Sequence, residues 1–292
     1  MAIVCWSSKF KPLALVWLSP RMLAWLVITV LLIVAPRLLF AKASIVPHLV
    51  PYNPGVAFIP VFAIYFGPAG VWGAAIASVW GDLLCDVWGP VIAFRAAGWF
   101  FAAWFLSQIA HPYRNPDGRS VRRLYAPLVG TTLLASIISA TWAAFGAEVL
   151  GLYPFSYIFY VSLIHHSVFC MGFGLLLHHL MLADLAARTP EWESVIGYDD
   201  RIEQSLRFMG LMMLSACVLL LVVAWLFSAM GLGHPPFKPS VIGTSHGKWL
   251  ELCVIPLMLL QLVAVFWPNT KLPPPAEGQL GSRAYTWASL LR

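Results

Sequence analysis

Charge is the scarcest feature of this sequence. Asp, Glu, Lys and Arg together make up 10% of the 292 residues, and hydrophobic residues make up 60%. A soluble globular protein carries about 25% charged residues. So few charges cannot cover a surface that faces water, which excludes a soluble domain and leaves lipid as the solvent for most of the chain. We therefore expect an all-α, polytopic integral membrane protein.

The sequence also lacks the motifs of several functional classes. It contains no nucleotide-binding loop, and no Ser/His or Cys/His arrangement indicates a nucleophile. Its net charge of +6 comes from basic residues in short loops between apolar runs, which indicates topology control and no nucleic-acid partner. We expect neither an enzyme nor a bound cofactor. The cysteines form no CxxC pair and are expected as small buried side chains: Cys5, Cys85, Cys170, Cys217 and Cys253.

Long apolar runs dominate what the sequence does contain. A helix needs about 20 apolar residues to cross the hydrocarbon of a bilayer, and turn residues such as Gly67-Pro68 and Gly89-Pro90 separate the runs. The second run is short, so its segment must be tilted, buried or only partly spanning. The eight expected spans are 22–40, 54–67, 69–87, 90–110, 125–149, 156–184, 207–231 and 248–267.

Basic residues orient these spans, because loops rich in Lys and Arg stay in the cytoplasm. With the 111–124 loop inside, both termini also fall inside, as in a multi-pass protein of a bacterial inner membrane. The basic residues then inside are Lys9, Lys11, Arg21, Arg114, Arg119, Arg122, Arg123, Arg188, Arg201, Arg207, Lys271, Arg283 and Arg292. Those left outside are Lys42, Lys238 and Lys248, with Arg37 near the outer end of the first span.

This topology divides the chain into five parts. Residues 1–21 are a cytoplasmic segment, 22–184 a six-span bundle, 207–267 two additional spans and 268–292 a cytoplasmic tail. Between the bundle and the additional spans, the 185–206 loop is rich in acidic residues. It is either a short helix that faces a partner or the membrane surface, or a solvated loop.

Ionisable side chains inside a membrane are costly, so each one is a candidate functional residue. Asp82 and Asp86 lie one helical turn apart and are expected on one face. Arg95 is expected at the depth of Asp82, and Glu148 at the outer end of the fifth span. One interpretation is a structural ion pair. The other is a pocket open to the outside, in which Arg95 binds an anion and the aspartates accept a cation or an amine.

Histidines form a second constellation in the sixth span. His165 and His166 could contribute to the same pocket or could bond within the bundle. His165 and His179 are 14 residues apart, close to four helical turns, and would share a face. That spacing is typical of haem-binding helices, so an intramembrane haem or metal protein is a further alternative. The haem site lacks a partner pair, since the remaining histidines at 48, 111, 234 and 246 are expected in loops.

Small residues recur every four positions in the third span. Such stripes allow close approach between helices. They either pack inside the bundle or dock a separate membrane subunit. The two stripes are Gly70, Ala74 and Ser78, and Gly73, Ala77 and Gly81.

Residues 50–110 combine a proline-led apolar helix, the Gly-Pro-x-Gly turn at 67–70, and a glycine-rich helix that ends near an Asp. In these features they resemble the substrate-binding S components of energy-coupling-factor vitamin transporters. It implies a six-helix bundle with an outward pocket for a small polar or vitamin-like solute. It also implies coupling to a separate transmembrane subunit and two ATPases. The first span lacks the family's Ala-x-x-x-Ala docking surface, and two extra spans follow residue 206.

Two functions are therefore expected ahead of the haem or metal alternative. The first is a solute-binding uptake subunit whose site contains Asp82, Asp86 and Arg95, with Glu148, His165 and His166 around them. The second is a sensory, assembly or scaffold subunit of a larger membrane complex, with other membrane proteins and the bilayer as its partners.

Overall fold

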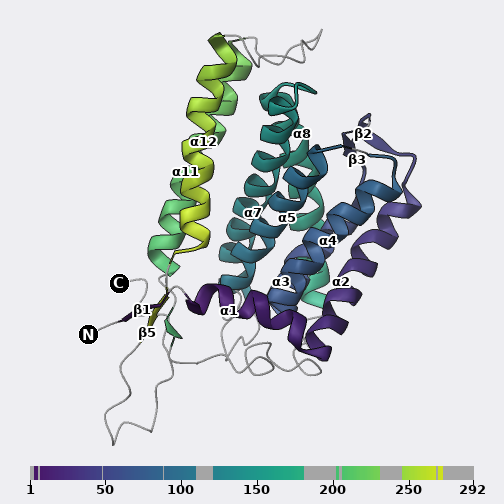
Figure 1. The fold of residues 1–292 in the computed structure, drawn as a ribbon, viewed down its shortest axis with the longest axis vertical. Coiled ribbons are helices and arrows are strands. Elements are labelled where there is room, and N and C mark those ends of the chain that lie inside the picture. Colours follow the sequence, from purple (N-terminus) through teal and green to yellow (C-terminus); the bar gives the residue numbers. More distant parts are fainter. Residues whose placement is uncertain are drawn as a thin grey trace, which may run out of the picture.

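The protein folds into a helical bundle in the computed structural model (Figure 1). The structure describes residues 3–5, 7–47, 49–87, 89–109, 121–180, 202–203, 206–230, 245–267 and 269–271. Its helices are α1 (Ser7–Leu15), α2 (Pro20–Leu39), α3 (Phe58–Phe66), α4 (Pro68–Leu84), α5 (Val91–Gln108), α7 (Val121–Val149), α8 (Phe155–Ser167), α11 (Leu206–Ala229) and α12 (Ser245–Val265). Shorter helical segments are the 3-10 turns η1 (Val16–Leu18) and η2 (Pro54–Ala57) and the π-helix η3 (Val168–Gly174).

Helix length and hydropathy identify a membrane protein, as expected. Five described helical segments are long and apolar enough to cross a bilayer: Pro20–Leu39, Val91–Gln108, Pro127–Val149, Phe155–Leu180 and Phe208–Ala229. Pro54–Phe66 and Leu252–Val265 are apolar but shorter. Large apolar side chains such as Leu31 and Leu211 are exposed on these helices, as lipid-facing positions require. The all-α bundle is therefore confirmed at this level.

Proline and glycine set the helix boundaries that the sequence indicates. Pro20 and Pro68 occupy the first turns of α2 and α4, where a missing N–H leaves no hydrogen bond broken. The Ser19 side chain accepts a hydrogen bond from the Met22 N–H and caps α2. Gly67, with φ of 51°, lets the chain reverse between α3 and α4 without an intervening loop.

Residues 44–66, which we call the second pass, contain only a short α-helix preceded by non-helical backbone, and this accounts for the short apolar run there. The hairpin of β2 (Ser44–Val46) and β3 (Val50–Pro51) leads into Asn53, and only then do η2 and α3 begin. Each residue from Ile59 to Phe66 is buried, so α3 is a central helix of the bundle. The backbone of η2 lies against α2 because Gly55 has no side chain: a Cβ there would strike the Ile33 carbonyl group.

The small-residue stripes of α4 pack inside the chain. All six residues are buried, and α4 contacts α2, α3 and α5. A Cβ on Gly73 would lie 2.6 Å from the Thr29 side chain, and one on Gly81 would lie 2.8 Å from Arg37. Neither stripe is left to dock a separate subunit. Of the two alternatives stated for these stripes, docking of a separate membrane subunit is therefore wrong, and packing inside the bundle is confirmed.

Replacing Gly70 with alanine should destabilise the protein by about 1–3 kcal/mol, the usual range for overpacking a core. The new Cβ would meet the backbone of Phe62, which cannot rotate away. Gly210→Ala is the matched control, because nothing lies within 4 Å of a Cβ there; it should stabilise α11 by up to about 1 kcal/mol. Unfolding midpoints in detergent would compare the two, and equal midpoints would contradict this packing.

A small sheet joins three segments that are distant in sequence. Strand β5 (Asn269–Lys271) pairs antiparallel with β1 (Ile3–Cys5) and with β4 (Ile202–Glu203). The three strands lie at one end of the bundle, at the bottom in Figure 1. Most of the acidic 185–206 loop and of the 268–292 tail lies outside the described residues, so the alternatives stated for that loop stay open.

Candidate functional site

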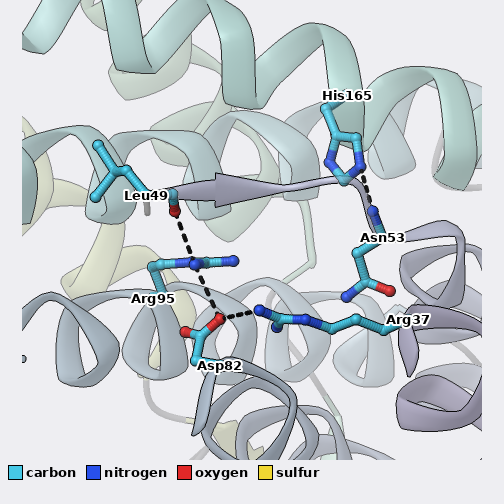
Figure 2. Close-up of polar contacts among 6 residues, drawn as sticks. All are labelled: Arg37, Leu49, Asn53, Asp82, Arg95 and His165. Carbon is cyan, nitrogen blue, oxygen red and sulfur yellow. Dashed lines mark hydrogen bonds and ion pairs between the residues drawn. The ribbon is translucent and has the colours of Figure 1, made fainter. Parts of the chain in front are cut away.

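Asp82 lies between two arginines in the interior of the bundle (Figure 2). It occupies the last turn of α4, whereas Arg37 comes from α2 and Arg95 from α5. One carboxylate oxygen, Oδ1, accepts from Arg37 Nη2 at 2.5 Å and lies 2.9 Å from Arg95 Nη1. Asp82 and Arg37 have no exposed surface, and Arg95 is 8% exposed. We call these three residues the charge cluster.

Charges in apolar surroundings predict the contact of Asp82 with Arg95 but not the part of Arg37 in it. The sequence places Arg37 near the outer end of the first span, outside the expected site. The available signal was an arginine inside a continuous apolar run, which in a membrane protein indicates a buried partner. Because Arg37 is the third member, the cluster carries two positive charges and one negative charge, a net charge of +1.

Asp86 does not belong to the cluster. Helix α4 ends at Leu84, and the N–H of Val87 turns back to bond the carbonyl oxygen of Asp82. Asp86 has a positive φ of 55° and is exposed. The expectation that the two aspartates share a helix face is therefore wrong, because the helix stops before the turn that would align them.

Polar side chains also bond the backbone of the broken second pass. Arg95 Nη1 donates to the Leu49 carbonyl oxygen at 2.9 Å, and the Asn53 N–H donates to His165 Nε2 at 3.1 Å (Figure 2). The Cys170 thiol donates to the Val56 carbonyl oxygen at 3.3 Å. Non-helical backbone inside a helical bundle needs such partners, because a buried N–H or C=O group without a hydrogen bond is costly. The site residues thus hold the second pass in place, as the structural alternative requires.

Removing the imidazole of His165 should destabilise the protein by about 1–3 kcal/mol, since the buried Asn53 N–H would lose its acceptor. His165→Ala is the test variant, and His165→Gln is its control because a glutamine amide offers an acceptor oxygen. Thermal unfolding of both variants in one detergent measures the difference. Equal destabilisation by both variants would show that packing, and not this hydrogen bond, sets the requirement.

A cavity of about 10 Å³ lies beside the charge cluster, under the β2–β3 hairpin. That volume accommodates about one water molecule. Arg95, Asn53, His165 and His166 supply polar groups to its wall, and Trp99 supplies an aromatic face. Its remaining lining residues are Leu49, Val50, Pro51, Ala143, Ile158 and Ser162.

A second cavity of about 20 Å³ shares Trp99 and His166 with the first. Hydroxyl groups from α7 line it, namely those of Thr132, Ser136 and Ser139. His166 therefore lies between the two cavities, with its ring edge-on to Trp99. Together they form two neighbouring small spaces within the bundle, of which the second is lined mainly by apolar surface.

The histidine at position 179 does not share the environment of His165. His165 is buried against Tyr52 and Phe169, whereas His179 is exposed. The π-helix η3 lies between them and places more residues in a turn than an α-helix does. The 14-residue spacing therefore does not return to one face, which removes the geometric basis of the haem alternative. Among the described residues, no group of three His, Cys, Asp or Glu side chains could hold a metal.

Glu148 is buried at the end of α7 but lines neither cavity. Its Oε2 accepts a hydrogen bond from the Phe155 N–H at 2.7 Å and so caps the start of α8. This contact fixes the α7–α8 turn. The expectation that Glu148 lines the pocket is therefore wrong.

Comparison of the chain with models of protein families, with curated proteins and with solved structures gives no match.

Proposed function

We propose that the protein is a membrane-embedded solute-binding subunit of the S-component type. The observation that supports this best is the cavity beside the charge cluster, which is buried and carries a net positive charge. A polar atom at its wall has unused hydrogen-bonding capacity: among the described residues that line the cavity, the Asn53 amide nitrogen Nδ2 is buried and has no partner. Buried polar groups are normally paired, so an unpaired donor at a cavity is consistent with a ligand site.

The proposed topology has eight crossings with both ends in the cytoplasm of a bacterial inner membrane. The three-stranded sheet supports it, because β1, β4 and β5 can pair only if residues 3–5, 202–203 and 269–271 lie on one side. That side carries most of the basic residues. The cavity under the β2–β3 hairpin then lies in the outer half of the bilayer.

Solute entry in this proposal requires the β2–β3 hairpin to move. Leu49, Val50 and Pro51 line the cavity and belong to that hairpin or its turn. A space of about 10 Å³ is too small for a vitamin-like solute. The closed hairpin thus represents a compact state, and binding would displace it outward.

An uptake subunit of the S-component type would couple to a separate energy-using partner. Purification of the tagged full-length chain in a mild detergent would identify it. Co-purification of an ATPase module, with solute uptake that depends on both, is the expected result. Co-purification with a respiratory or envelope complex, without uptake, would contradict the transport proposal.

A scaffold or assembly subunit is the second candidate function. It is favoured by the hydrogen bonds of Arg95 and His165 to the backbone of the second pass. These bonds explain the two buried polar side chains without a ligand. Solute binding separates the two candidates. A scaffold subunit would show no ligand-dependent stabilisation, whereas the S-component proposal requires it.

A further inference from the structure

We infer that the solute carries one negative charge. This inference rests on the proposed function and adds the chemical class of the ligand. The residues expected in the pocket, Asp82, Asp86 and Arg95, would together carry a net charge of −1, with Arg95 expected to bind an anion and the aspartates a cation or an amine. In the structure Asp86 leaves the site and Arg37 joins it, which changes the net charge to +1.

An unbalanced charge inside a membrane protein is expensive. Burying an ion without a counter-charge carries a large electrostatic penalty, even after the surroundings relax. Asp82 provides one carboxylate for two guanidinium groups, and both bind the same oxygen. A monoanion in the neighbouring cavity would balance the remaining positive charge.

Arg95 is the member of the cluster that reaches the cavity. A guanidinium has five N–H donors, and both the ion pair with Asp82 and the hydrogen bond to the Leu49 carbonyl oxygen involve Nη1. The other edge of the guanidinium, formed by Nε and Nη2, is therefore available to a carboxylate. Arginine binds carboxylates through two parallel hydrogen bonds.

Asn53 provides a second donor. Its Oδ1 accepts from the Gly55 N–H at 3.0 Å, which leaves the amide nitrogen Nδ2 without a partner. The residue is 1% exposed and lines the same cavity as Arg95. A donor amide next to a guanidinium suits an anion and disfavours a cation.

The second cavity indicates where an uncharged part of the ligand would lie. Trp99 and His166 border both spaces, and Thr132 Oγ1 and Ser139 Oγ in the second have no partner. A small organic monoanion would place its charged group at Arg95 and its neutral part along Trp99. These hydroxyl groups would then bond that neutral part.

Matched ligands that differ only in charge test the inference. Thermal unfolding of the full-length protein in detergent is measured at constant ionic strength with acetate, acetamide or ethylammonium. A larger set uses benzoate, benzamide and benzylammonium. We expect only the anion of a set to raise the unfolding midpoint. Stabilisation by chloride and acetate alone indicates a free anion, whereas stabilisation by benzoate indicates the carboxylate of a larger solute.

Three variants connect the effect to the site. Arg95→Gln should weaken the apparent affinity for the anion at least tenfold, while Asp86→Asn, which alters an exposed carboxylate nearby, should leave it unchanged. If Arg95→Gln does not fold, Asn53→Asp replaces it. That substitution preserves the shape and the acceptor for the Gly55 N–H, and it adds the negative charge that the site lacks. It should abolish the anion effect.

The outcomes distinguish this inference from the proposed function. Stabilisation by the ammonium ligand or equally by the neutral one, lost in Arg95→Gln, would overturn the anion assignment and retain solute binding. No stabilisation by any ligand in folded wild-type protein, together with co-purification in a non-transport complex, would overturn both.

Discussion

Asp82→Asn should lower the free energy of unfolding by about 3–5 kcal/mol, the range for removing one partner from a buried ion pair. The carboxylate is fully buried, accepts a hydrogen bond from Arg37 and forms ion pairs with both Arg37 and Arg95. Asparagine preserves the size of the side chain but leaves two guanidinium groups close together without a counter-charge. Chemical or thermal unfolding in detergent micelles measures the loss.

Asp86→Asn is the control for that experiment. It makes the same chemical change four residues away, at an exposed position, and should alter stability by no more than about 0.5 kcal/mol. If the two variants lost similar free energies of unfolding, the ion pairs of Asp82 would not be what stabilises the fold.

Arg95→Met should destabilise the protein by about 1–3 kcal/mol, because the buried Leu49 carbonyl oxygen would lose its donor. Methionine preserves much of the aliphatic volume, and Asp82 keeps Arg37 as its counter-charge, so no buried charge is left uncompensated. The β2–β3 hairpin should also become more accessible, which amide hydrogen exchange of residues 44–53 would detect.

Arg95→Gln separates the two contributions. A glutamine amide still has donors for the Leu49 carbonyl oxygen but no charge for Asp82. It should therefore lose less stability than Arg95→Met and should protect the hairpin amides better. Equal exchange rates in the two variants would mean that Arg95 does not hold the hairpin through its hydrogen bond.

The helices of this protein could be predicted because lipid imposes a simple rule on sequence. Apolar runs of about 20 residues have few other uses, and Pro20, Pro68 and Gly67 mark where helices begin or reverse. The broken second pass could be recognised only as an anomaly of length. Hydropathy carries no information on which side chains bond a non-helical backbone, so the roles of Arg95 and His165 needed the structure.

Part of the site could also be predicted from the sequence, because charged residues are rare in apolar runs. Asp82 and Arg95 stand out as charges in apolar surroundings, and antiparallel helices joined by a short turn place them at one depth. Spacing rules then failed where a helix departs from regular geometry: α4 ends before Asp86, and a π-helix shifts the face of His179. Arg37 is 45 residues from Asp82 in sequence, so only the packing of α2 on α4 reveals their contact.

The most direct test of this account compares wild-type protein with Arg37→Gln in acetate and in acetamide. Arg37→Gln leaves Asp82 paired with Arg95 and gives the cluster no net charge, so the variant should fold with a smaller loss than Asp82→Asn. Acetate should raise the unfolding midpoint of the wild type and not that of the variant, and acetamide should raise neither. An equal response of both proteins to acetate would contradict an anion site created by the unbalanced positive charge.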